Sequence, residues 1–384
     1  MNIVVISHSF LESENQKNII YLSKMENVQC IVPKTGSVNL WKNRVFQAET
    51  NSQNLFIAYK PTYITPSQYF LWTLSMGFIS RKPDIINIAY NPWSLIFFQV
   101  WLYRTLFCPK AIIVCSIKKN TFVCKPGIFG AIKRWTAHQS HHFVDHVFAE
   151  SKMVSDLFSE KLNYSRNRIS IIKFLGVDVD NFVPCGDNEI SGTKFKPLVV
   201  GYCGRFDAEK GIMDLVDALI EIQHEDKSPV ILRLMGRGAY RDSLDDKIAM
   251  IAKEFEWLEV LPPVPNSQVK FFLQGIDVFV LPSRIMMDHQ EHDAHILKEA
   301  LASGIPCIGT KCGVIPEILG GGVGILVNPE SVNELREAIG QLIKDFELRR
   351  GLSIRGRIIA KQEYSLNVIA QRKIKVFREL IDNE

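Results

Sequence analysis

The chain has 384 residues, of which 47% are hydrophobic and 22% are charged. This composition excludes disordered and fibrous classes, and the length favours two domains that each bury a core. The net charge of +4 is too small to suggest a nucleic-acid-binding protein.

The charge is unevenly distributed along the chain. Residues 1–190 carry 20 Lys and Arg against 13 Asp and Glu, a net charge of +7, and residues 191–384 carry 25 against 28, a net charge of −3. A basic first half suits a polyanionic acceptor or an anionic membrane surface. Ordinary scatter of surface charges explains the asymmetry equally well, so both interpretations stay open.

Short apolar runs alternate with amphipathic stretches of helical length. The runs predicted as strands are NIVVIS, QCIVP, NLFIAY, DIINIA, AIIVCS, HVFAES and ISIIKF, followed by PLVVGYC, VILRLMG, LEVLP, DVFVLPS, PCIGT and GILVNP. Such alternation is typical of parallel sheets with helices on both faces. The predicted fold class is therefore α/β, with two doubly wound, Rossmann-like domains.

The boundaries follow from composition. A polar stretch near residues 185–195 is predicted as the linker, which gives domains of residues 1–188 and 189–362. Residues 363–384 have apolar spacing of three and four, so they are predicted as a terminal helix that packs back on the first domain.

The most hydrophobic stretch, residues 93–107, contains Gln99 and Arg104 and is shorter than the ~20 apolar residues of a membrane-spanning helix. A core helix is the favoured interpretation, and an aromatic face lying on a bilayer is the alternative. The eight cysteines form no CxxC pair, and MNIVVISHSF is predicted as a buried strand rather than a signal peptide. These features predict reduced thiols and a cytoplasmic location.

Three motifs in the second half carry the chemistry. The first, GYCGRFDAEKG at residues 201–211, follows a strand, and its Arg205 and Lys210 place two cations over the strand end. Such cations suit a diphosphate, because the Arg guanidinium can form bidentate hydrogen bonds with phosphate oxygens and the Lys ammonium adds a point charge. This motif taken alone gives only even odds for phosphate binding.

The second motif, residues 282–306, contains Glu291 and Glu299 eight residues apart. Glu291 is predicted to precede a helix and Glu299 to lie about two turns inside it. The helix N-terminus between them is suited to an anion, and a carboxylate deeper in the helix can accept hydrogen bonds from a sugar diol. Two exposed carboxylates on a solvated helix face are the alternative.

The third motif, residues 309–331, combines a strand, a glycine turn and Pro316-Glu317 at the start of a short helix. Residues 197–329 resemble the family 4 glycosyltransferases. The resemblance rests on five patterns in a fixed order: GR-x4-KG, E-x7-E, A-x-x-x-G-x-P, G-x-x-PE and G-x-LV. The first half matches that family only in outline. The resemblance implies the GT-B fold, retention of the anomeric configuration, and no metal or other cofactor.

The resemblance also implies roles for individual residues. Arg205 and Lys210 are expected to bind the donor diphosphate, Glu291 the hydroxyls of the transferred sugar, and Glu299 the ribose. The expected catalytic residues are Arg205, Lys210 and Glu291. The expected donor-binding residues are Gly204, Arg205, Lys210, Glu291, Ala294, His295 and Glu299.

The expected donor is a nucleoside diphosphate sugar, with a UDP-sugar favoured over a GDP-sugar. The expected acceptor is a hydroxyl of a glycan or lipid-linked molecule in bacterial surface polysaccharide synthesis, with peripheral membrane association as an open alternative. A catalytically weak nucleotide-sugar-binding or scaffolding partner is the main rival. A dinucleotide oxidoreductase is disfavoured because no G-x-G-x-x-G follows the first strand.

The chain departs from the family pattern where family members read EGFG and this sequence has Glu291, His292, Asp293 and Ala294. Asp293 beside a phosphate is repulsive unless it points away. Ser116 and Lys118 stand where many members have a histidine after the strand AIIVCS.

Two further patterns are set aside. The D-x-D triplet at Asp178 to Asp180 is interpreted as the linker entry rather than as a metal site. Three histidines spaced by four, at positions 138, 142 and 146, predict one helix face, and a second cluster at 289, 292 and 295 predicts donor-site lining.

Overall fold

The computed structural model describes residues 1–35, 55–65, 68–71, 82–119, 121–124, 126–184, 197–225, 230–238, 244–287 and 290–383. The chain forms two compact units, one of Met1–Gly176 with Leu366–Glu384 and the other of Val177–Ser365. The division lies between Gly176 and Val177, ahead of the expected boundary at residue 188. That boundary and the expected linker lie outside the described residues.

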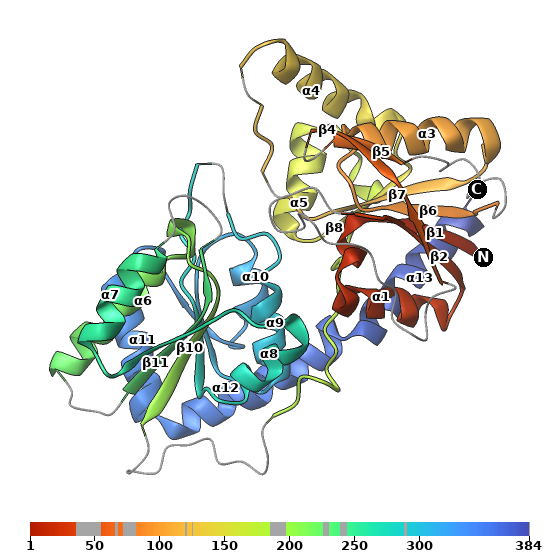
Figure 1. Cartoon of the computed structure of the whole chain (residues 1–384). Helices are drawn as coiled ribbons and strands as arrows, with labels where there is room; N and C mark the ends of the chain where they lie inside the picture. Colours follow the sequence, from red (N-terminus) through yellow and green to blue (C-terminus); the bar gives the residue numbers. More distant parts are fainter. Residues whose placement is uncertain are drawn as a thin grey trace. The chain divides into compact units, whose positions relative to one another are not determined.

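The first unit contains a seven-stranded parallel sheet in the order β3-β2-β1-β6-β7-β8-β9 (Figure 1). Each strand coincides with a run predicted as a strand. A separate antiparallel hairpin, β4 (Pro61–Thr65) with β5 (Gln68–Leu71), was not predicted. The strands of the sheet are β1 (Asn2–Ile6), β2 (Asn27–Pro33), β3 (Phe56–Tyr59), β6 (Ile85–Ile88), β7 (Ile112–Ile117), β8 (His146–Ala149) and β9 (Ile169–Ile171).

Helix α3 (Leu95–Phe107) is formed by the most hydrophobic stretch, for which a core helix and an aromatic face on a bilayer were the alternatives. The Ser94 hydroxyl caps it by accepting a hydrogen bond from the Phe97 amide at 3.4 Å, and Phe97 and Val100 are fully buried. The core-helix interpretation is therefore confirmed for the first half of the helix, whereas Leu102, Leu106 and Phe107 toward its end are exposed. Within the described ranges, no helix is long and apolar enough to span a membrane. The other helical elements of this unit are η1 (His8–Leu11), α1 (Ser13–Ser23), α4 (Ile128–Gln139), η3 (Ser140–His142), α5 (Lys152–Asp156), η4 (Leu157–Lys161), η5 (Arg166–Arg168) and α13 (Leu366–Asp382).

The C-terminal helix α13 belongs to the first unit, where it packs against α1. Its Phe377 is fully buried, with its ring centroid 5.3 Å from that of Phe148 in β8. The ammonium of Lys373 donates to the backbone oxygen of Phe174 at 2.7 Å. Burial lowers the pKa of Lys373 to about 8, because the charged form loses its hydration.

The second unit contains a six-stranded parallel sheet in the order β12-β11-β10-β13-β14-β15. Counted along this unit, the strand order is 3-2-1-4-5-6, the arrangement of doubly wound sheets. The direction of winding reverses between β10 and β13, and ligands of such sheets bind beyond the carboxyl ends of strands at this switch point. The strands are β10 (Leu198–Arg205), β11 (Val230–Arg237), β12 (Leu258–Leu261), β13 (Val278–Leu281), β14 (Cys307–Thr310) and β15 (Ile325–Val327).

Helices cover both faces of the second sheet (Figure 1). Helices α6 and α11 pack together on one face, and α9 and α12 pack together on the other. The central strands β13 and β14 and the first five residues of β10 are buried throughout, as a sheet with two covered faces requires. The helical elements are η6 (Ala208–Lys210), α6 (Ile212–Glu225), α7 (Asp245–Glu254), α8 (Asn266–Leu273), α9 (His295–Ala302), α10 (Ile315–Leu319), α11 (Val332–Lys344), α12 (Phe346–Ile359) and η7 (Ala360–Tyr364).

Candidate functional site

Strand β10 carries the first motif to the switch point of the second unit. Gly204 lies beside Gly236 of β11 in the parallel register, and Arg205 is the last residue of the strand. The phenol of Tyr202 is fully buried and donates to the backbone oxygen of Arg205 at 2.8 Å. This hydrogen bond fixes the backbone from which the Arg205 side chain projects.

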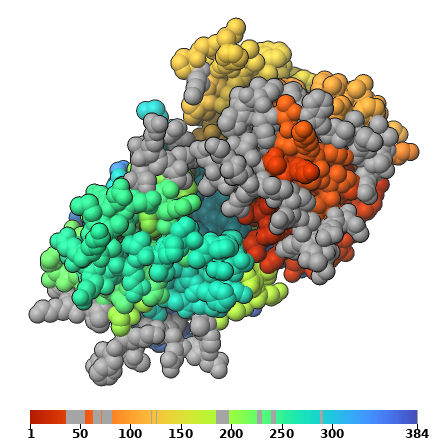
Figure 2. Space-filling model, in the orientation of Figure 1, coloured from red at the N-terminus to blue at the C-terminus, as the bar shows by residue number. Residues whose placement is uncertain are grey.

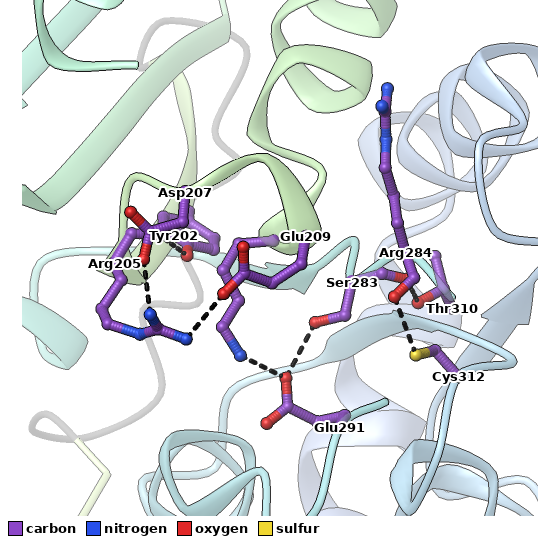
Figure 3. A network of polar contacts seen from close by, with 10 residues as sticks. Tyr202, Arg205, Asp207, Glu209, Ser283, Arg284, Glu291, Thr310 and Cys312 are labelled. Atoms are coloured by element: carbon purple, nitrogen blue, oxygen red, sulfur yellow. Dashed lines mark hydrogen bonds and ion pairs between the residues drawn. The ribbon is translucent and has the colours of Figure 1, made fainter. Parts of the chain in front are cut away.

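The guanidinium of Arg205 contacts two carboxylates of its own turn (Figure 3). One nitrogen donates to Asp207 at 2.5 Å and another donates to Glu209 at 2.8 Å. Asp207 is almost completely buried, whereas the Arg205 side chain keeps 25% of its exposure. Arg205 is therefore held at the mouth of the site by acidic residues that the sequence analysis did not single out.

Lys210 and Glu291 meet although 81 residues separate them in the chain. The Lys210 ammonium donates to Glu291 Oε2 at 2.7 Å, and the Ser283 hydroxyl donates to the same oxygen at 2.9 Å (Figure 3). Both partners of the ion pair are only 12% exposed. One carboxylate thus joins the first motif to the loop after β13.

The third motif holds the backbone of Glu291. The Val314 amide donates to the Glu291 backbone oxygen at 3.0 Å. Gly313 has φ +55°, and a Cβ there would lie only 2.0 Å from that oxygen. Only glycine combines this left-handed conformation with so close an approach. All three motifs therefore converge on Glu291.

The start of the loop after β13 is fixed by side chains that sequence reasoning missed. Arg284 donates to both carboxylate oxygens of Asp214 in α6, at 2.8 Å for the Nε contact, and these hydrogen bonds raise the pKa of Arg284. The Thr310 hydroxyl donates to the Ser283 backbone oxygen at 2.5 Å, and the Cys312 thiol donates to that of Arg284 at 3.3 Å (Figure 3). Neither Arg284 nor Thr310 stands in a pattern that marks such contacts.

Helix α9 begins directly after Ala294, which has φ +44°. Glu299 lies about one turn inside this helix, so the predicted position two turns inside is wrong. The reason is that residues 290–294 form the loop, which delays the start of the helix. Glu299 is 3% exposed, lies 3.6 Å from His295 Nε2, and accepts from the Asn266 amide at 3.4 Å.

The altered family loop has its own internal partner. The fully buried ammonium of Lys298 donates to Asp293 Oδ1 at 2.6 Å. The expected repulsion between Asp293 and a bound anion is therefore offset by an adjacent positive charge. No signal in the sequence marked Lys298, because two oppositely charged residues five apart are common on loops and helices.

The predicted histidine face is wrong. His138 lies in α4, His142 lies in the following helical turn η3, and His146 is the first residue of strand β8. The helix ends too early for the spacing to continue. His146 is buried, which lowers its pKa to about 4. In the second predicted cluster, His289 lies outside the described residues. His295 is the first residue of α9 and lies near Glu299.

The structure thus brings Arg205, Lys210 and Glu291 to the switch point, and it places Ala294 just before α9, His295 at its first residue and Glu299 one turn further on. Two cations and a helix N-terminus can hold an anion, while Glu291 and Glu299 can accept hydrogen bonds from hydroxyls. This combination suits a ligand that carries both phosphate and sugar.

Residues 187–358 match the family model of glycosyl transferases group 1. The chain is 26% identical over 186 residues to a D-inositol 3-phosphate glycosyltransferase of Corynebacterium jeikeium, covering 45% of this chain and 43% of that protein. It is 32% identical over 138 residues to the putative teichuronic acid biosynthesis glycosyltransferase TuaC of Bacillus subtilis, covering 36% of this chain and 31% of that protein. The chain therefore matches less than half the length of each of these relatives.

Solved structures share the fold of the whole chain. A glycosyltransferase from Rickettsia africae aligns over 100% of this chain and 99% of its own, with a TM-score of 0.74 at 14% identity. The HepE protein of Anabaena, solved in complex with UDP-glucose, aligns over 99% of this chain and 100% of its own, with a TM-score of 0.69 at 16% identity. The chain thus has the two-domain GT-B fold of glycosyltransferases, and its second unit carries the match to the group 1 glycosyl transferase family.

Proposed function

We propose that this chain is a retaining glycosyltransferase of family 4 that moves a hexosyl group from a nucleoside diphosphate sugar to a hydroxyl. A UDP-sugar is the favoured donor over a GDP-sugar, in line with the UDP-glucose complex of the HepE fold neighbour. A glycan or lipid-linked molecule of surface polysaccharide synthesis is the favoured acceptor, in line with the teichuronic acid relative. The reaction takes place in the cytoplasm, without a metal or other cofactor.

The observation that supports this proposal is the convergence of the three motifs on Glu291. Lys210 of the first motif, Ser283 of the second and the backbone around Gly313 of the third all contact this residue. Arg205 lies on the same turn as Lys210 and at the same end of β10. Arg205, Lys210 and Glu291, the residues expected to bind the diphosphate and the sugar, therefore lie at the same end of the sheet.

Donor binding requires an exchange of ion-pair partners. Lys210 is paired with Glu291, so its ammonium must turn from this carboxylate to the donor diphosphate. Glu291 still accepts from Ser283 after this exchange, and its oxygens can then accept hydrogen bonds from hydroxyls of the transferred sugar. The ion pair thus keeps both groups oriented until the donor arrives.

The proposed chemistry breaks the bond between the anomeric carbon and the diphosphate oxygen and forms a bond from the same face to the acceptor oxygen. The acceptor proton leaves with the departing nucleoside diphosphate. Negative charge develops on the leaving diphosphate, where Arg205, Lys210 and the amides at the start of α9 stabilise it. Glu299 accepts from the ribose hydroxyls, and His295 and Ala294 line the turn beside it.

Alanine substitution of the two cations tests the assignment. Arg205→Ala and Lys210→Ala are each expected to lower turnover by about 10²-fold, as the loss of one oxyanion-type donor does. Lys253→Ala, which removes an exposed cation from α7 of the same unit, is the matched control and retains full turnover. Near-wild-type transfer by both site variants would remove the assignment.

A nucleotide-sugar-binding or scaffolding partner is the second candidate, because His292, Asp293 and Ala294 replace the usual loop. A thermal-shift panel of UDP, GDP and ADP with their sugars identifies the nucleotide, since a bound ligand raises the unfolding temperature. Nucleoside diphosphate release is then measured with and without acceptor. Binding without acceptor-dependent release favours the scaffolding partner, and release that requires acceptor favours the transferase.

A further inference from the structure

Helix α4 of the first unit presents its large apolar side chains to solvent. Ile128, Phe129 and Ile132 are 71%, 84% and 51% exposed, and Trp135 is 66% exposed. Residues spaced by three and four share one helix face, so Ile128, Ile132 and Trp135 form a continuous stripe with Phe129 at its border. The helix lies at the top of Figure 1, and its yellow residues form the top of the surface in Figure 2.

The opposite face of α4 attaches the helix to its unit. Gly130 and Ala137 are buried there, and Ala137 lies about 200° around the axis from Trp135. Lys133 donates to the backbone oxygen of Val123 at 2.6 Å, which ties the helix to the loop before it. The helix therefore buries the small residues Gly130 and Ala137 and exposes its largest apolar ones, the reverse of a helix that only serves a core.

The segment of the sequence that contains α4 carries charge of a single sign. Residues 85–144 contain seven Lys and Arg and no Asp or Glu. Among the described basic residues, Arg134 lies on α4 itself and is exposed, and Lys119 is exposed in the loop before this helix. An apolar stripe in a segment that carries cations and no acidic residue from 85 to 144 fits an anionic lipid surface, which binds apolar side chains below its headgroups and cations at them.

We propose that α4 docks the first unit on an anionic lipid bilayer, with Ile128, Phe129, Ile132 and Trp135 inserted at the headgroup boundary. The surface excess of positive charge draws the chain to the bilayer, and burial of the stripe holds it there. A protein partner or a second copy of the chain is disfavoured, because neither needs sixty consecutive residues free of acidic side chains. This inference does not depend on the proposed transfer reaction.

Vesicle binding tests the proposal. The purified chain is sedimented with phosphatidylcholine vesicles, with and without phosphatidylglycerol, at low and high salt. We expect binding that requires phosphatidylglycerol and weakens with salt, since the surface attraction is screened. Phe129→Ser and Trp135→Ser are each expected to weaken binding by about tenfold, and Arg134→Glu is expected to weaken it as well.

Phe271→Ser is the matched control, because Phe271 of α8 is 62% exposed and lies in the other unit. This variant is expected to bind vesicles like the wild type. All the substituted side chains are exposed, so each variant should retain its unfolding temperature and its nucleotide-induced thermal shift. These two measurements keep a failure of lipid docking distinct from a failure of the proposed transfer function.

Either of two results would overturn the proposal. One is wild-type protein that stays in the supernatant with anionic vesicles, and the other is Phe129→Ser and Trp135→Ser variants that bind as tightly as the wild type. If the wild type binds no vesicles and sedimentation velocity shows concentration-dependent self-association that disappears in Phe129→Ser, the stripe is assigned to an interface between copies.

Discussion

Replacing Gly313 by alanine perturbs the contact through which the third motif holds Glu291. A non-glycine residue at φ +55° costs about 1–2 kcal/mol in the left-handed region. The new Cβ would also lie 2.0 Å from the Glu291 backbone oxygen, so this oxygen must retreat until the contact reaches at least 3.0 Å. That movement breaks the 3.0 Å hydrogen bond from the Val314 amide, which adds about 1–3 kcal/mol.

The expected loss in the free energy of unfolding is therefore about 2–5 kcal/mol, measured by urea denaturation. Gly321→Ala is the matched control, since Gly321 has φ +65° and a Cβ added there would have no heavy atom within 4 Å. It should lose only the conformational cost of about 1–2 kcal/mol. Gly313→Ala should also weaken the thermal shift induced by the nucleotide, whereas Gly321→Ala should not. Equal losses in stability and equal nucleotide shifts for the two variants would refute the reasoning.

Two further predictions concern buried lysines. Asp293→Ala is expected to lower the free energy of unfolding by about 3 kcal/mol, because the fully buried ammonium of Lys298 loses this carboxylate. Lys298→Met should lower the free energy of unfolding by less, because it leaves no buried charge without its partner. A larger loss for Lys298→Met in urea denaturation would contradict this. The pKa of Lys373 is about 8 in the folded chain and 10.5 in the unfolded chain, so the unfolded chain binds more protons between these two pH values. The free energy of unfolding should therefore rise by about 3 kcal/mol from pH 8 to 10.5. Lys373→Met should lack that rise, and parallel pH profiles for the two proteins would count against the assignment.

Much of the fold followed from the sequence because the pattern that predicts it is local. Runs such as DIINIA and DVFVLPS are predominantly apolar, as strands covered on both faces must be, and each became a strand of a parallel sheet. The β4-β5 hairpin was missed because its pairing depends on a partner strand rather than on its own periodicity. The three histidines were misplaced because their spacing suggests one continuous helix, whereas α4 ends at Gln139, before His142.

The sequence by itself determined the order of the motifs and the residue types at the site: Arg205 and Lys210 after a strand, and Glu291 before a helix. Only the tertiary structure decided how these residues pair. Lys210 meets Glu291 and Arg284 meets Asp214, because neighbouring parallel strands bring distant parts of the chain to one edge of the sheet. Spacing along the chain carries no record of such contacts. The exposed stripe of α4 likewise emerged only once the buried face of that helix was known.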